Sequence, residues 1–515
     1  MMSNRSHDIL FQLVHSLEKA EKRHFKLYIK RSSAREDLKI VQLFDALANM
    51  REYDEKLLLK KLSGVEKPQL ANLKTHLYKQ LLASLRLLKS ADSLDLQLNE
   101  QFDYAHILYK KGLFAQSLRI LDRAKEIANH NQKYTFLTQI IALEKRIEGL
   151  HITRSMHERV EQLAIEANTV SRHIDEVGRL SNLALLLFSW FTRHGHARNK
   201  KDEAGVKKFM QEHLPPNAHH VTGFYEQMYL YQSFCWYAFI RQDFLQYYRY
   251  AQKWIDLFDA NPLMIRVETS HYIKGLHYLL NAHFDLRNFR EFKKALKKFE
   301  HFAQTDRVKD HDNFRIQAFV YISTARINQH FMEGTFKEGL KIVPEIEEGM
   351  KEYYLFLDPH RLMVMNYKIA TLYFGSGDFD TSIDYLQKIM SEPGELRTDL
   401  QCYSRLLHLL AHYELGNLEL MEPLSRSVYR FMAKMENLTV VEQEMFKFFR
   451  KPLTGPSEIK PELQKFLQKV KHLEKNRFET RAFAYLDIIS WLESKVNNKT
   501  MSQVIHEKYV KSKRK

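Results

Sequence analysis

Apolar and polar positions alternate along most of the chain with a period of three to four residues. Residues 134–150 and 461–470 show this spacing clearly, and it is typical of amphipathic α-helices. Glycine and proline number only 16 and 11 among 515 residues, so long stretches contain neither. Because both residues interrupt helices, their scarcity favours helix over a strand-and-turn architecture. The pattern therefore predicts an all-α fold.

Short segments of glycine, a middle residue and an aromatic residue separate several of these helical stretches. They are Gly112-Leu113-Phe114, Gly334-Thr335-Phe336 and Gly377-Asp378-Phe379. Glycine suits the left-handed conformation that ends a helix, so each segment predicts a turn between two helices. Weaker copies lack either the glycine or the aromatic residue: Gln242-Asp243-Phe244, Arg287-Asn288-Phe289 and Gly416-Asn417-Leu418. We expect a helical hairpin around each of these turns.

Two of the hairpins share a longer pattern. The first contains Ala105, Tyr109, Gly112, Phe114, Ser117 and Leu121, and the second contains Ala370, Phe374, Gly377, Phe379, Ser382 and Leu386. Small residues that face each other across a hairpin let two helices approach closely, and the aromatic residue after the turn fills the space below. This pattern resembles the tetratricopeptide (TPR) repeat. The resemblance implies a TPR-like α-solenoid of stacked helical hairpins, which offers a long surface to a partner.

The hydrophobic residues that follow the turns give the spacing of the units. Intervals of 45, 47, 43 and 39 residues separate Phe244, Phe289, Phe336, Phe379 and Leu418. TPR repeats recur about every 34 residues, so the units of this chain are divergent. We expect a basic helical N-terminal module at residues 1–90 and a TPR-like solenoid at residues 91–445. Residues 446–515 are expected to form a linker, a C-terminal capping hairpin and a basic tail.

The C-terminal region departs from the repeat pattern. Proline, glycine and serine at residues 452–461 predict a linker or long loop. Helices at residues 461–476 and 478–494 are expected to form the last hairpin, in which Trp491 and Leu492 cap the solenoid. The tail at residues 508–515 is polar and basic, so we expect it to be disordered or frayed.

Positive charge is concentrated at the two ends of the chain. Residues 1–90 carry 18 Lys and Arg against 10 Asp and Glu, and residues 446–515 carry 17 against 7. The whole chain is +16, so residues 91–445 have a net charge near −2. Basic ends attract nucleic acid, an anionic membrane surface or an acidic protein. They also provide the polar outer face that terminal repeats need, and we prefer this simpler interpretation.

The N-terminal module contains the best candidates for partner binding. Residues 16–32 predict a basic amphipathic helix around Phe25, Leu27 and Ile29. Helices at residues 54–62 and 69–88 follow, an arrangement compatible with a helix-turn-helix DNA-binding motif and equally with an ordinary helical hairpin. The candidate partner-binding residues on the basic helix are Lys22, Arg23, Lys26 and Arg31.

Other groups that suggest chemistry have simpler interpretations. A histidine cluster can bind metal, but no HExxH or paired CxxC motif accompanies His194, His196, His219 and His220. Glu345 and Glu348 are interpreted as a solvated helix face. A dense aromatic group is interpreted as core packing, with a peptide-binding groove as the alternative: Tyr229, Tyr231, Phe234, Trp236, Tyr237 and Phe239. No phosphate-binding loop, nucleophile elbow or kinase motif occurs. We expect no catalytic residue, cofactor or metal.

The cysteines and the hydropathy bear on location. Cys235 and Cys402 each lie in an apolar helical stretch, so buried thiols are expected in preference to a disulfide. No run of about 18 uninterrupted apolar residues occurs, and the N-terminus lacks the apolar core of a signal peptide. We expect a cytoplasmic protein.

These observations favour a non-enzymatic scaffold or adaptor that binds another macromolecule, most readily a protein, along its helical surface. Side chains that face inward from the first helix of each hairpin would carry the affinity. The alternative is a nucleic-acid-associated transcriptional regulator that uses the basic N-terminal helices, with affinity that falls steeply as salt rises.

Overall fold

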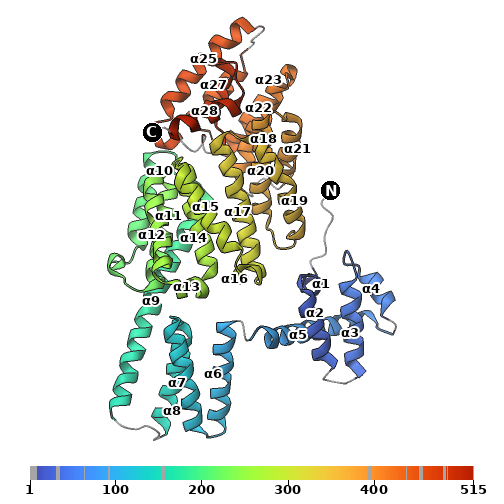
Figure 1. The fold of residues 1–515 in the computed structure, drawn as a ribbon, viewed down its shortest axis with the longest axis vertical. Coiled ribbons are helices and arrows are strands. Elements are labelled where there is room, and N and C mark those ends of the chain that lie inside the picture. Colours follow the sequence, from blue (N-terminus) through green and yellow to red (C-terminus); the bar gives the residue numbers. More distant parts are fainter. Residues whose placement is uncertain are drawn as a thin grey trace. The chain divides into compact units, whose positions relative to one another are not determined.

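The computed structural model describes residues 8–30, 35–62, 64–90, 93–151, 157–392, 397–435, 438–451, 456–479, 483 and 485–513. Helices are the only regular secondary structure within these residues, which confirms the all-α prediction (Figure 1). The chain separates into two compact units, Met1–Ser171 and Arg172–Lys515, called unit 1 and unit 2. The boundary falls within the long helix α9 (His157–His194). The domain limits expected at residues 90 and 445 remain predictions.

Five helices begin unit 1, namely α1 (Ile9–Ser16), α2 (Lys19–Lys30), α3 (Arg35–Ala48), α4 (Glu55–Lys61) and α5 (Lys67–Lys89). Their apolar faces form one cluster that includes Leu10, Val14, Phe25, Ile29, Phe44, Leu47, Leu77 and Leu81. The helix expected at residues 16–32 begins later, at Lys19, because Leu17 has an extended backbone after α1; residues 31 and 32 lie outside the described residues. Leu27 is 52% exposed, so it does not share the buried face of Phe25 and Ile29.

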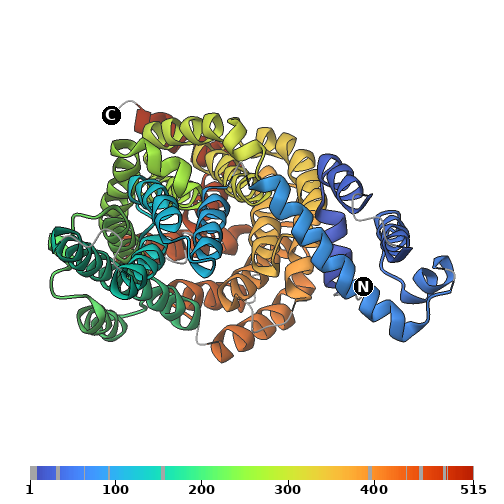
Figure 2. The same ribbon diagram turned by 90° about the horizontal axis from the view of Figure 1, so that it is seen from below.

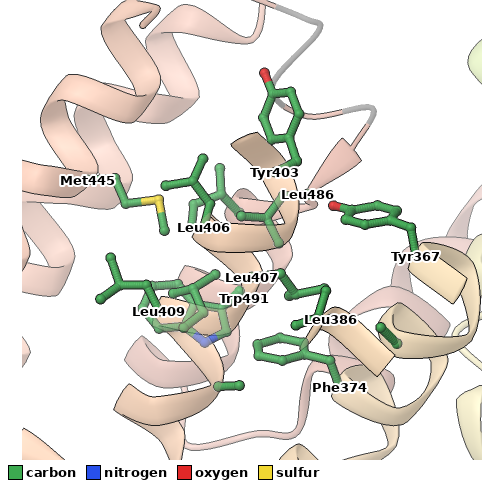
Figure 3. Packing of buried hydrophobic residues seen from close by; sticks show 14 of the residues in the cluster. Tyr367, Phe374, Leu386, Tyr403, Leu406, Leu407, Leu409, Met445, Leu486 and Trp491 are labelled. Atoms are coloured by element: carbon green, nitrogen blue, oxygen red, sulfur yellow. The ribbon is translucent and has the colours of Figure 1, made fainter. Parts of the chain in front are cut away.

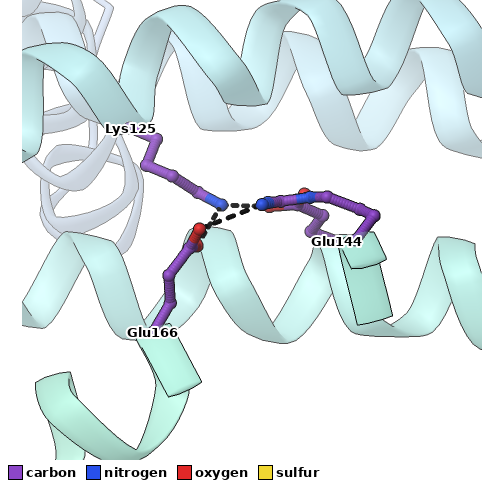
Figure 4. Close-up of polar contacts among 4 residues, drawn as sticks. Lys125, Glu144 and Glu166 are labelled. Carbon is purple, nitrogen blue, oxygen red and sulfur yellow. Dashed lines mark hydrogen bonds and ion pairs between the residues drawn. The ribbon is translucent and has the colours of Figure 1, made fainter. Parts of the chain in front are cut away.

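Three further helices complete the described hairpins of unit 1: α6 (Leu94–Lys110), α7 (Phe114–His130) and α8 (Tyr134–Leu150). Ser117 on α7 donates a 2.8 Å hydrogen bond from its hydroxyl to the carbonyl of Ala105 on α6, and both residues are fully buried. An ionic cluster joins the next helices, as Figure 4 shows for Lys125, Glu144 and Glu166. Arg159 completes this cluster through Nε, 2.8 Å from Glu144, and Nη1, 2.9 Å from Glu166.

Unit 2 continues with helices that pack mostly against their neighbours in sequence. After α9 come α10 (Lys200–His213), α11 (Phe224–Ile240), α12 (Phe244–Ala260), α13 (Pro262–Val267), α14 (Thr269–Asp285), α15 (Phe289–Ala303), α16 (Asp306–Lys309) and α17 (Asp312–Glu333). The next helices are α18 (Phe336–Gly339), α19 (Val343–Glu352), α20 (Pro359–Ser376), α21 (Phe379–Met390), α22 (Thr398–Glu414), α23 (Leu418–Lys434) and α24 (Val440–Phe449).

The first helices of successive hairpins are neighbours in unit 2. Helix α14 packs against α17, α17 against α20, and α20 against α22. The second helices α12, α15, α18 and α21 each pack against the first helix that follows them. Figure 2, which views many of these helices end-on, shows the green, yellow and orange helices following one another around a curve. We call the surface formed by α14, α17, α20 and α22 the first-helix face.

One type of turn recurs between paired helices. Among the left-handed residues of the described chain, eight with φ between +52° and +94° share one hydrogen-bond pattern: Gly112, Gln132, Gln242, Arg287, Gly334, Gly377, Gly416 and Asn498. The N–H of the next residue donates to the carbonyl five residues earlier at 2.8–3.1 Å. This is the Schellman arrangement, which satisfies carbonyl groups at a helix end. The predicted hairpin turns are therefore present, including the copies that lack glycine.

The last helices of unit 2 are α25 (Pro456–Leu473), α27 (Ile488–Val496) and α28 (Met501–Lys513), and α28 packs back onto α17 and α20. The linker expected at residues 452–461 lies partly outside the described residues, and from Pro456 onward it is helical. Helix α28 extends through Lys513, so the expectation of a disordered tail is wrong for residues 508–513. The His506 ring Nδ1 lies 2.9 Å from the carbonyl of Glu333, at the end of α17.

The largest buried cluster of unit 2 joins these C-terminal helices to the hairpins. Figure 3 shows Trp491 of α27 packed near Leu407 and Leu409 of α22, while Phe374 and Leu386 come from α20 and α21. Trp491 is 1% exposed, and its indole N–H donates to Glu414 Oε1 at 2.6 Å. The C-terminal segment is therefore part of the core of unit 2.

Candidate functional site

The candidate residues on the basic N-terminal helix have different surroundings. Lys26 forms an ion pair with Asp45 of α3, at 2.7 Å between Nζ and Oδ1. Lys22 is half-buried and Arg23 is exposed on the same helix α2. Arg31 lies outside the described residues. One of the three described cations is therefore matched by a carboxylate of its own module.

The histidines around residue 199 do not form a metal cluster within the described residues. His196 is buried, and its Nδ1 lies 2.8 Å from the carbonyl of Phe239. The ring of His194 packs on Trp190, and the ring of His219 packs near Phe234. These rings are used in local packing on different elements.

The aromatic residues of α11 contribute to packing, as expected. Phe234 and Tyr237 are less than a tenth exposed, and Phe234 stacks on Tyr250 of α12 with ring centroids 4.3 Å apart. The two cysteines are fully buried in α11 and α22 and do not form a disulfide, which agrees with the prediction of buried thiols. Burial raises the pKa of Cys235 well above its ordinary value, which disfavours the reactive thiolate.

A cluster of polar side chains on the first-helix face was not predicted from the sequence. Lys274 and His277 come from α14, Tyr321 and Asn328 from α17, and Lys368 from α20. The rings of His277 and Tyr321 stack at 4.0 Å with an angle of 12° between their planes. The ammonium group of Lys368 donates to Asn328 Oδ1 at 2.6 Å. We call these five residues the lysine–tyrosine site.

Helix positions explain how the site assembles. Lys274 and His277 are three residues apart on α14, so their side chains project from one side of that helix. Asn328 is 3% exposed and offers its amide oxygen to the neighbouring α20. Because α14, α17 and α20 are consecutive neighbours, side chains distant in sequence come close enough for the charge of Lys368 to act on His277.

The lysine–tyrosine site has an excess of positive charge in a partly desolvated setting. In the described part of the chain Lys368 donates to Asn328 and not to a carboxylate, and Asp285 acts on it only through its charge; no carboxylate acts on Lys274 in this way. Burial lowers the pKa of Lys274, and it lowers the pKa of Lys368 to about 8 against the opposing effect of Asp285. Burial raises the pKa of Asp285 to about 7. Free lysine has a pKa near 10.4, so the charged form is disfavoured here.

The positive charges of the two lysines also affect the pKa of His277. Burial, together with the charges of Lys368 and Lys274, lowers its pKa to about 3. The imidazole is therefore neutral near pH 7 and contributes a stacking surface and not a third charge. Its Nε2 lies 3.0 Å from the side-chain amide nitrogen of Asn281. Two ammonium groups near a neutral, stacked imidazole suit an anionic group with an aromatic or apolar group beside it.

No protein-family model matches the sequence, and no curated protein shows significant similarity to it. None of the helices in the described residues combines the length and the apolar character needed to cross a membrane.

Proposed function

We propose that the protein is a non-enzymatic scaffold or adaptor with a TPR-like solenoid, and that the first-helix face binds an acidic segment of another protein. The observation that carries the proposal is the lysine–tyrosine site, where burial disfavours the charges of Lys274 and Lys368 and only the charge of Asp285 opposes this effect at Lys368. Burying two ammonium groups with so little compensation costs free energy. A carboxylate supplied by a partner would offset that cost, which gives the two lysines a function in binding.

Three structural features support the TPR-like interpretation. The Schellman turn recurs between paired helices, and the first helices of successive hairpins are neighbours. The hydrogen bond between a serine and an alanine carbonyl twelve residues earlier occurs twice, in the hairpins of Ser117 and Ser382. A stack of hairpins presents the side chains of its first helices along one surface, which suits an extended peptide. Two buried thiols that do not form a disulfide are consistent with the proposed cytoplasmic location.

The experiment uses fluorescence anisotropy with a labelled Glu-rich peptide that contains tyrosine, and a control peptide in which Lys replaces every Glu. We expect the intact chain to bind the acidic peptide and not the basic one. The paired substitutions Lys274→Gln and Lys368→Gln should weaken binding at least about tenfold, the effect of losing about 1.4 kcal/mol. Lys297→Gln is the matched control, because Lys297 is an exposed lysine on the second helix α15.

Fluorescence anisotropy also distinguishes the scaffold from the alternative, a nucleic-acid-associated regulator. Charge attraction to nucleic acid falls steeply with salt, so a labelled oligonucleotide is titrated near physiological ionic strength. The scaffold proposal predicts no submicromolar binding there. The alternative of a transcriptional regulator would be favoured if the oligonucleotide binds tightly at this salt concentration. That binding should then be lost, with helicity retained, when four residues are changed to Gln: Lys22, Arg23, Lys26 and Arg31. If the variant with both Lys274→Gln and Lys368→Gln binds the acidic peptide as tightly as wild type, the first-helix face is not the binding surface.

A further inference from the structure

Three side chains of metal-binding type meet between α9 and α11 in unit 2. His173 and Glu176 are three residues apart on α9, and Glu226 belongs to the first turn of α11. One ligand atom from each residue lies within 4.8 Å of the other two. The His173 Nδ1 and the Glu226 Oε1 are 2.6 Å apart. The two helices are held together nearby by buried apolar residues that include Leu180, Leu183, Leu230 and Phe234.

The Glu226 carboxylate is buried without full compensation. The residue is 0% exposed, and its Oε2 has no hydrogen-bond partner among the described residues. Within the cluster, the imidazole of His173 lies near two carboxylates, those of Glu176 and Glu226. Burying a carboxylate oxygen without a hydrogen-bond partner costs free energy. A positively charged group bound at this site would offset that cost.

The backbone leaves space for this carboxylate. A Cβ atom on Gly223 would lie 2.0 Å from Glu226 Oε2, which is closer than any real contact. Gly223 is the residue directly before α11, and its φ of −68° is accessible to every residue type. Steric space, and not backbone conformation, is therefore what glycine provides here.

We propose that His173, Glu176 and Glu226 bind one divalent transition-metal ion, with Zn²⁺ as the best fit. An imidazole nitrogen together with carboxylate oxygens suits Zn²⁺, whereas Ca²⁺ and Mg²⁺ prefer ligand sets made only of oxygen. Two carboxylates balance the charge of the ion. Three protein ligands leave a fourth position for water. The ion would join α9 to the first turn of α11, independently of the lysine–tyrosine site.

The test uses untagged full-length protein freed of metal with a chelator and then titrated with Zn²⁺ by calorimetry. We expect one site per chain, a metal content of one equivalent by mass spectrometry after gel filtration, and a raised Tm. Co²⁺ should give the visible absorption of a low-coordinate site with nitrogen and oxygen ligands.

Substitutions distinguish a metal site from a structural histidine–glutamate pair. Glu176→Gln is the decisive variant, because Glu176 is half-buried and the His173–Glu226 pair does not require it. We expect at least a tenfold loss of Zn²⁺ affinity with an unchanged fold in the absence of metal. Glu226→Gln should also abolish the Tm increase. The matched control is Glu268→Gln, which alters a His271–Glu268 pair at 3.1 Å. Failure to bind Zn²⁺, or affinity unchanged by Glu176→Gln, would overturn the proposal.

Discussion

The hydroxyl of Ser382 donates a 2.9 Å hydrogen bond to the carbonyl of Ala370, and both residues are fully buried where α21 crosses α20. The equivalent pair Ser117 and Ala105 has the same contact at 2.8 Å in unit 1. Small side chains at both positions allow the helix backbones to approach within reach of a serine hydroxyl. The crossing therefore has no space for a larger residue.

Ala370→Leu is expected to destabilise unit 2 by about 1–3 kcal/mol, because three added carbons overpack the crossing. Urea denaturation followed by circular dichroism measures the change in the free energy of unfolding. Ala105→Leu should have a similar effect in unit 1. The control is Ala303→Leu at the C-terminal end of α15, where the residue is half-buried at the edge of a core cluster and not fully buried like Ala370. Equal stabilities of Ala370→Leu and wild type would contradict the packing described here.

A second prediction concerns the turn at Gln132. Its φ of +53° is unfavourable for a residue with a Cβ atom, by roughly 1–2 kcal/mol. Gln132→Gly should remove that strain and stabilise the chain by about 0.5–1 kcal/mol after the added entropy of the unfolded chain is subtracted. Gly112→Ala is the reciprocal substitution at the preceding turn, where φ is +74° and a Cβ would contact nothing within 4 Å. Gly112→Ala should lower the free energy of unfolding by about 1 kcal/mol. Urea denaturation of both variants checks the prediction, which is contradicted unless Gln132→Gly raises this free energy and Gly112→Ala lowers it.

The third prediction tests the ionic cluster of unit 1. Glu144 is 0% exposed and accepts from both Lys125 and Arg159. Glu144→Gln leaves those two cations with only Glu166, so we expect a loss of about 3 kcal/mol in the free energy of unfolding. Glu161→Gln, on the exposed side of the same region, should change it by less than about 0.5 kcal/mol. Similar values for both variants would show that the cluster adds little to stability.

The fourth prediction separates binding from stability at Lys274. This half-buried lysine lacks an ion-pair partner in the described residues, and burial lowers its pKa. Lys274→Met keeps the length of the side chain and removes the desolvated charge, so it should stabilise the chain by about 0.5–2 kcal/mol. The same variant should bind the acidic peptide at least about tenfold more weakly. If Lys274 instead stabilises the fold, Lys274→Met would lower the free energy of unfolding, and this result would contradict the prediction.

The sequence predicted the hairpin turns best where glycine marks them. Gly112, Gly334 and Gly377 adopt the left-handed conformation that their residue type favours. The turn at Gln132 was missed, because neither a glycine nor a glycine–aromatic segment identifies it. There the packed helices on both sides impose a conformation that local preference disfavours.

The lysine–tyrosine site could not be predicted from the sequence, because it too depends on packing between helices. A lysine within an amphipathic helix is ordinarily interpreted as solvent-exposed, and nothing local identifies Lys368 as desolvated. Its surroundings come from Asn328, which is 40 positions earlier in the chain. In the same way, the contact of Trp491 with Glu414 spans 77 positions, so the packing of the C-terminal helices could not be inferred from hydrophobic spacing.

The last prediction links peptide binding to protonation of Lys368. In the free protein its pKa is about 8, because burial disfavours the charged form. A carboxylate placed beside the ammonium would raise this pKa toward the ordinary value near 10.4. Between these two values the complex holds more protons than the separate components, so binding takes up protons and affinity falls as pH rises.

Calorimetry at about pH 8.5, in two buffers with different ionisation enthalpies, measures this uptake directly. We expect wild type to take up a fraction of one proton per peptide bound, and Lys297→Gln to behave identically. Lys368→Met should abolish both the uptake and most of the affinity. Binding without proton uptake at this pH would mean that the peptide carboxylates do not approach Lys368, because a charge brought next to a partly deprotonated amine must shift its equilibrium.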